Sequence, residues 1–78
     1  MKIVVVGLGY VGLSNAVLLA QHNEVIGVDI SQSHIDMINM RKPPFSDNII
    51  REYFNDVSLD LKATSDLDAS VVGANYVL

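Results

Sequence analysis

The sequence predicts an α/β fold, in which a parallel sheet carries helices on both faces. β-Branched runs at residues 2–7 and 24–29 enclose an apolar segment of helical length, at about 10–21. This strand, helix, strand pattern is typical of parallel sheets. Half of the residues are hydrophobic, as expected for a sheet that is buried on both faces. The 78 residues suffice for one small domain.

Two further helices are expected in the middle of the chain. Ser31 can cap the first, which ends before Pro43-Pro44 because proline disfavours helix in the residue before it. Ser46 and Asp47 can start the second. The apolar residues of this second helix fall on one face and are expected to be core anchors: Ile49, Ile50, Tyr53 and Phe54.

The last part of the chain completes the predicted sheet. Residues 59–64 alternate as a strand with one polar face. Ser65, with Asp68 three residues on, is typical of a helix start, and residues 75–78 begin another apolar strand. With right-handed crossovers, the strands are expected in the order 3-2-1-4.

A glycine turn joins the first strand to the first helix. Gly7, Gly9 and Gly12 have the Gly-x-Gly-x-x-Gly spacing, directly after a β-branched run. Gly7 permits a sharp turn, Gly9 leaves room for a pyrophosphate, and Gly12 lets the helix approach the sheet closely. A pyrophosphate would accept hydrogen bonds from free amides at the positive end of the helix. The pattern predicts a dinucleotide-binding, Rossmann-like domain.

Asp29 completes this pattern. It ends the second β-branched run, seventeen residues after Gly12, where a carboxylate can accept hydrogen bonds from ribose hydroxyls. Its negative charge would repel a 2′-phosphate. We therefore expect NAD, rather than NADP, as the cofactor.

Composition excludes several classes of site. The formal net charge is -4 and the five Lys and Arg residues are scattered, so no nucleic-acid partner is expected. The absence of cysteine excludes disulfides, thiolate metal sites and thiol nucleophiles, and no catalytic or metal-binding residue is predicted. No apolar run reaches the ~18 to 20 residues of a membrane span, and glycines interrupt the one segment that imitates a signal peptide. We expect no membrane contact and a cytoplasmic location.

The chain ends in Tyr76-Val77-Leu78, inside a predicted strand and without a cap or polar tail. We therefore expect residues 1–78 to be the N-terminal part of an NAD-binding domain, with the catalytic and substrate domains outside this chain.

Longer stretches carry a specific resemblance. They are MKIVVVGLGYVGLSNAVLLAQHNEVIGVDIS at the start, which includes Gly-Tyr-Val-Gly-Leu at 9–13, and the later Ala63-Thr64-Ser65-Asp66 and Ala74-Asn75-Tyr76-Val77. On these residues the chain resembles the UDP-glucose 6-dehydrogenase and GDP-mannose dehydrogenase family in its short bacterial form. The similarity spans the whole chain and only the N-terminal portion of such an enzyme.

The resemblance implies that the complete enzyme is a homo-oligomer that oxidises the C6 alcohol of a nucleotide sugar in two NAD-dependent steps. UDP-glucose would become UDP-glucuronate, a uronic acid donor for polysaccharide biosynthesis. The family's thioester-forming cysteine and its lysine, asparagine and aspartate helpers lie downstream of residue 78. The resemblance carries over the cofactor half of the site, with backbone amides of Tyr10 and Val11 on the pyrophosphate: Gly7, Gly9, Tyr10, Val11, Gly12 and Asp29.

His34 stands where relatives often have a lysine near the adenosine ribose. It is therefore a candidate cofactor contact, and alternatively a solvated residue of the second predicted helix. Two other functions stay open. One is a fragment of a different NAD or FAD oxidoreductase, which a downstream cysteine and lysine set would reject. The other is a stand-alone nucleotide-binding or interaction module without catalysis, which a genuine stop after Leu78 would favour.

Overall fold

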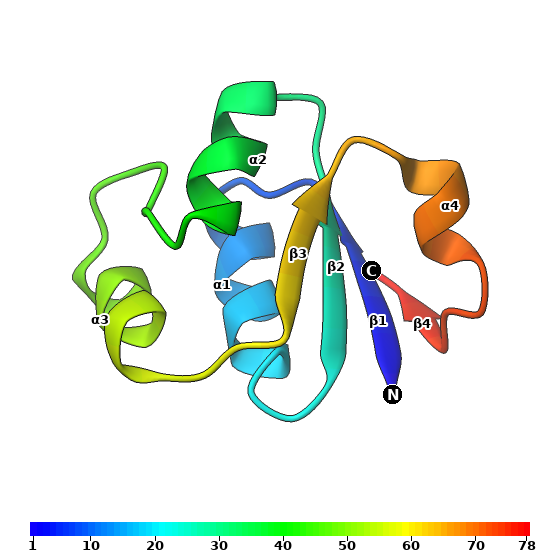
Figure 1. Ribbon diagram of the computed structural model, residues 1–78, viewed down its shortest axis with the longest axis horizontal. Helices are drawn as coiled ribbons and strands as arrows, with labels where there is room; N and C mark the ends of the chain where they lie inside the picture. The colour runs from blue at the N-terminus through cyan, green and yellow to red at the C-terminus, as the bar shows by residue number, and fades with distance from the viewer.

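The computed structural model describes residues 1–78 as a parallel sheet with helices packed against it (Figure 1). None of the helices has the length and apolar character needed to cross a membrane. The elements are β1 (Lys2–Val6), α1 (Tyr10–Leu19), β2 (Glu24–Val28), α2 (Gln32–Asn39), α3 (Asn48–Asp56), β3 (Leu61–Thr64), α4 (Leu67–Val71) and β4 (Tyr76–Val77).

The four strands lie in the order β3-β2-β1-β4, and every neighbouring pair is parallel. This confirms the predicted α/β class and strand order. Ile3 of β1 pairs with Val25 of β2, which in turn pairs with Leu61 of β3. The carboxyl ends of β1, β2 and β3 therefore meet at one edge of the sheet, where α1 and α2 begin.

The helices form a layer on each side of the sheet. Helices α1, α2 and α3 gather on one side, and α4 lies on the other (Figure 1). The main core is between the sheet and the first three helices, and it includes Leu13 and Ala16 of α1, Ile38 of α2 and Phe54 of α3. Val4 alternates to the opposite face, which α4 covers, and is also fully buried.

Three predictions about individual residues were wrong. Ile49 is 64% exposed and is not a core anchor, because Ile50 and Phe54, one turn apart, occupy the buried face of α3. The cap of α4 is Asp66 rather than Ser65, since the Asp66 carboxylate accepts a hydrogen bond from the N–H of Ala69 at 3.0 Å. Strand β3 begins at Leu61 instead of residue 59.

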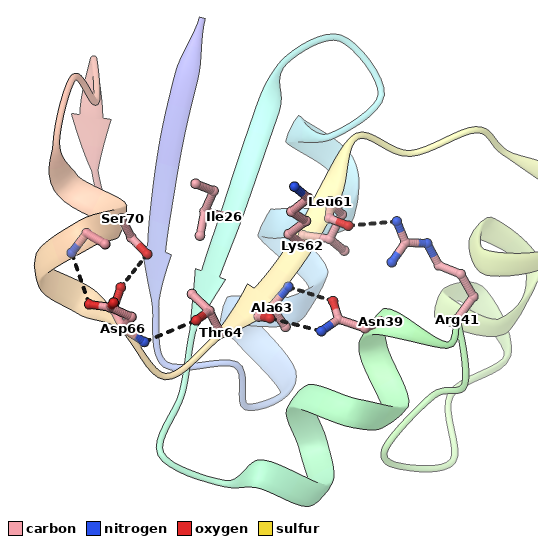
Figure 2. A pocket seen from close by; sticks show the side chains of 10 residues that line it. Ile26, Asn39, Arg41, Leu61, Lys62, Ala63, Thr64, Asp66 and Ser70 are labelled. Atoms are coloured by element: carbon pink, nitrogen blue, oxygen red, sulfur yellow. Dashed lines mark hydrogen bonds between the residues drawn. The ribbon is translucent and has the colours of Figure 1, made fainter.

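Side chains from the end of α2 close the free edge of β3 (Figure 2). The Asn39 amide donates to the carbonyl of Ala63 at 2.9 Å and accepts from its N–H at 2.8 Å, as a neighbouring strand would. The Arg41 guanidinium donates to the carbonyls of Leu59 at 3.2 Å and Leu61 at 2.7 Å. These contacts satisfy outward-facing backbone groups that would otherwise invite pairing with another strand.

Arg41 adopts a left-handed backbone conformation, with φ at 59°, which a side chain with a Cβ rarely takes. Its guanidinium also donates to the carbonyl of Ile38 at 2.8 Å and lies 5.9 Å from the centre of the Phe54 ring. Burial lowers the pKa of the Arg41 guanidinium from its ordinary value. The three carbonyl contacts offset the backbone strain.

Candidate functional site

The glycine turn leads from β1 into α1, and two of its glycines are sterically required. Gly7 has φ at 88°, in the region that favours glycine, and its N–H donates to the carbonyl of Val28 at 2.8 Å. A Cβ at Gly12 would overlap the carbonyl oxygen of Gly7 and lie 3.0 Å from its carbonyl carbon. The first turn of α1 therefore rests directly on the end of β1, as the spacing predicted.

Gly9 differs from these two glycines. Its φ of -70° is open to any residue, and a Cβ there would meet no protein atom within 4 Å. Nothing in the packing of the chain requires glycine at this position. The open space in front of Gly9 is where a ligand could approach the backbone.

The N-terminus of α1 has no side-chain cap. Ser31, Asp47 and Asp66 each cap their own helix by accepting a backbone N–H, whereas the residue at the start of α1 is Gly9. The first N–H groups of a helix have no partner within it. They carry partial positive charge and form an anion site when nothing caps them. The structure therefore leaves the amides at the start of α1 free for an external acceptor.

The carboxylate of Asp29 lies against the glycine turn. One of its oxygens accepts the N–H of Leu8 at 2.8 Å, and the other accepts the N–H of Ser31 at 2.9 Å. The backbone donors of Ser31 and Leu8 hold the pKa of Asp29 below its ordinary value, and the nearby His34 lowers it further. The lowered pKa keeps the carboxylate ionised. Each oxygen can still accept another hydrogen bond, so the carboxylate is available for a hydroxyl donor.

A cavity of about 380 Å³ opens beside these groups at the carboxyl ends of β1 and β2. Its walls are Val6, Gly7, Val28, Asp29, Ile30, Ser65 and Leu67. Ile30 is 99% exposed although it is a large apolar residue. A cavity at the carboxyl ends of parallel strands is the usual ligand site of such sheets.

Sequence reasoning missed the cavity residues Ile30, Ser65 and Leu67. A signal for them existed, because Ile30 follows Asp29 directly, and the carboxyl end of β3 must lie at the same sheet edge.

Gly27 was also missed. A Cβ on Gly27 would come within 2.7 Å of both terminal methyl groups of the fully buried Leu8, whose N–H holds Asp29. Glycine inside a strand often marks such a close approach. Gly27 thus lets the Leu8 side chain fill the space above β2 and supports the turn indirectly.

The remaining predicted residues lie around the outer side of the turn. The side chains of Tyr10 and Val11 are mostly exposed, at 58% and 71%. The imidazole of His34 lies edge-on to the ring of Phe45, with the two centres 6.4 Å apart. Among the described residues, no group of three or more His, Asp or Glu side chains is placed to hold a metal ion.

A larger cavity of about 560 Å³ lies over β3, beside α4 (Figure 2). Most of its polar side chains already serve the fold: Asn39 and Arg41 bind the strand edge, Thr64 accepts the N–H of Asp66, and Ser70 donates to the carbonyl of Asp66. This cavity is therefore a weaker candidate than the one beside Asp29.

The chain was compared with known proteins. Over 66 residues it is 48% identical to the UDP-glucose 6-dehydrogenase of Streptococcus pneumoniae, covering 85% of the chain and 17% of that protein. It is 40% identical over 80 residues to the UDP-glucose 6-dehydrogenase of Campylobacter jejuni, covering 100% of the chain and 20% of that protein. The chain thus spans a fifth or less of the length of these curated relatives.

A solved structure of similar fold is a ternary complex of GDP-mannose dehydrogenase from Pseudomonas aeruginosa. It superposes with a TM-score of 0.87 at 33% identity, covering 99% of this chain and 18% of that one. Residues 1–78 also match the sequence profile described as UDP-glucose/GDP-mannose dehydrogenase family, NAD binding domain. The chain therefore belongs to the UDP-glucose/GDP-mannose dehydrogenase family, and it corresponds to the family's NAD-binding domain.

Proposed function

We propose that residues 1–78 bind the ADP half of NAD at the glycine turn. The pyrophosphate accepts hydrogen bonds from the free amides of Tyr10 and Val11, in the open space before Gly9. The observation that carries this proposal is the uncapped N-terminus of α1 beside a side-chain-free Gly9, in a chain whose other helices are all capped by side chains.

The adenosine ribose then lies at Asp29, which is ionised and keeps free acceptor capacity. A ribose bearing a 2′-phosphate would meet the Asp29 charge at close range, so NAD is preferred to NADP. His34 lies near enough to lower the pKa of Asp29, and it is the side chain proposed as a cofactor contact beside the ribose. The exposed Ile30 and the neighbouring Leu67 give the adenine apolar walls.

The complete protein would use this site to oxidise a nucleotide sugar, for which we propose UDP-glucose. The primary alcohol at C6, two NAD⁺ and one water give a carboxylate, two NADH and three protons. NAD supplies the hydride acceptor in both steps. With no cysteine, residues 1–78 cannot supply a thioester nucleophile, so the chemistry belongs to residues outside this chain. The identities of 48% and 40% to UDP-glucose 6-dehydrogenases support this choice of substrate.

We further propose that the complete protein is a homo-oligomer in the cytoplasm that serves polysaccharide biosynthesis, as the family resemblance implies. Sedimentation of the complete protein and its location in cell fractions test the first two points.

The function is tested by assaying the complete protein with UDP-glucose, GDP-mannose and UDP-N-acetylmannosamine, each with NAD and with NADP. We expect two NADH per UDP-glucose and strong preference for NAD. Asp29→Ala should weaken NAD binding about tenfold to a hundredfold, because a hydrogen bond to a charged group contributes about 1.5 to 3 kcal/mol. The same change should weaken NADP binding far less, so the preference for NAD over NADP should narrow.

Equal Michaelis constants for NAD and NADP in the unmutated protein would contradict the role of Asp29. Turnover of GDP-mannose but not of UDP-glucose would correct the proposed substrate and leave the proposed cofactor site unchanged. Nucleotide binding without any turnover would favour the stand-alone module.

A further inference from the structure

We propose that Phe45 is a positioning residue for the cofactor, because it joins the two groups that flank the ADP site. The proposal rests on the function proposed above. Phe45 lies in the link between α2 and α3 and is half-buried, packed against the main core. It reaches Tyr10 at the pyrophosphate end of the site and His34 at the ribose end.

The contacts of Phe45 are made by its ring. Its centre lies 5.8 Å from that of the Tyr10 ring, with the two planes tilted by 44°. The centre of the His34 ring is 6.4 Å away on an edge-on approach, with an interplanar angle of 70°. Both arrangements fall in the range in which aromatic pairs attract each other. One side chain therefore touches the first residue of α1 and the first turn of α2.

The same link approaches Tyr10 at a second residue, Asp47. The Tyr10 hydroxyl and the Asp47 carboxylate lie close together on the wall of one cavity, and the carboxylate raises the pKa of Tyr10 while Tyr10 lowers that of Asp47. Asp47 also accepts the N–H of Ile50 at 2.9 Å and so starts α3. The Tyr10 side chain thus has Phe45 and Asp47 of this link as neighbours, although most of its surface is exposed.

These contacts bear on ligand binding because the phosphate donors proposed above are backbone groups. Restraining the Tyr10 side chain helps to hold its N–H in place, and no side chain caps this helix. Phe45 and Asp47 restrain Tyr10 through its side chain. Phe45 also contacts the imidazole of His34, which lies near Asp29. We infer that Phe45 reduces the motion that the site must lose when the cofactor binds.

The experiment measures the binding of ADP-ribose and NAD to the complete protein by calorimetry. Phe45→Ala should weaken both about threefold to tenfold, the factor expected when one side chain of the site must be ordered on binding. Phe45→Tyr should restore binding to within about twofold, since the aromatic contacts remain. In Phe45→Ala, the KM for NAD should rise while kcat stays unchanged.

A core substitution serves as the matched control. Phe54 is 7% exposed in α3 and contacts neither Tyr10 nor His34 through its ring. Phe54→Leu should lower the melting temperature and leave ADP-ribose affinity unchanged, whereas Phe45→Leu should lower affinity with a smaller loss of stability.

The outcomes separate the two proposals. An unmutated protein that does not bind ADP-ribose refutes the cofactor site itself. Binding that is equal in Phe45→Ala and the unmutated protein overturns the role of Phe45 alone. If Phe45→Ala does not fold, Phe45→Leu decides: an affinity loss no greater than that of Phe54→Leu reduces Phe45 to a packing residue.

Discussion

Gly9 and Gly12 belong to one motif, yet the structure predicts opposite consequences when each is changed to alanine. At Gly9 the new methyl group meets no protein atom within 4 Å, and φ is -70°, which alanine accepts. Alanine is a poorer N-cap than glycine, but it also loses less conformational entropy on folding by about 0.4 to 1 kcal/mol. These two effects oppose each other, so Gly9→Ala should change the free energy of unfolding by less than about 1 kcal/mol.

The same methyl group stands in the space proposed for the pyrophosphate. Losing one charge-assisted hydrogen bond from the α1 amides costs about 1.5 to 3 kcal/mol, so Gly9→Ala should weaken NAD binding about tenfold to a hundredfold. At Gly12 the methyl group overlaps the Gly7 carbonyl instead. Because both groups are held by backbone, α1 must move off β1, and we expect a loss of about 3 kcal/mol or more, the upper range for overpacking.

Urea unfolding and NAD titration of the two variants, made in the complete protein, measure both effects. The expected result is a stable Gly9→Ala protein that binds NAD poorly, and a destabilised Gly12→Ala protein. Unchanged NAD affinity in Gly9→Ala would refute the assignment of the pyrophosphate to this turn. Equal destabilisation of both variants would refute the steric distinction between them.

Three further predictions concern acid, the strand edge and the isolated chain. The pKa of Asp29 is lowered by folding, so its stabilising contribution is present above the ordinary value of about 3.9 and is lost as pH falls through the folded value. In thermal melts from pH 7 downwards, Asp29→Asn should therefore lose less stability in acid than the unmutated protein does. Equal losses of stability would contradict this. Arg41→Ala should lower the free energy of unfolding in urea by about 1 to 3 kcal/mol, because carbonyls at the β3 edge lose their donor. Arg41→Gly should lower it by about 1 kcal/mol less, since glycine relieves the positive φ. The reverse order would refute the role of backbone strain. Residues 1–78 alone should produce no NADH with UDP-glucose and should be marginally stable or associated in light scattering, because Tyr76, Val77 and Leu78 are more than half exposed. A cooperatively melting monomer would contradict the second part, and NADH production the first.

The parts of the fold that the sequence predicted are those set by local signals. The strand order, the glycine turn and the position of Asp29 follow from two β-branched runs, fixed glycine spacing and right-handed crossovers. The caps Ser31 and Asp47 were likewise visible as residue types before apolar segments. At α4, Ser65 and Asp66 are both capping residues, and only the backbone geometry decides between them.

Other features depend on contacts between distant residues. The exposure of Ile49 depends on which side of α3 packs against α1, which periodicity alone does not define. Arg41 gives no sequence signal for a left-handed backbone or for contacts with a strand some twenty residues away. The approach of Phe45 to Tyr10 and His34 likewise arises from the path of the link between α2 and α3.

The measurement that tests the central claim most directly is a crystal structure of the complete protein soaked with NAD. We expect phosphate oxygens within hydrogen-bond distance, about 2.7 to 3.2 Å, of the N–H groups of Tyr10 and Val11, and the adenosine ribose hydroxyls on the carboxylate of Asp29. Phosphates bound elsewhere, or a ribose that leaves Asp29 paired only with Leu8 and Ser31, would contradict it.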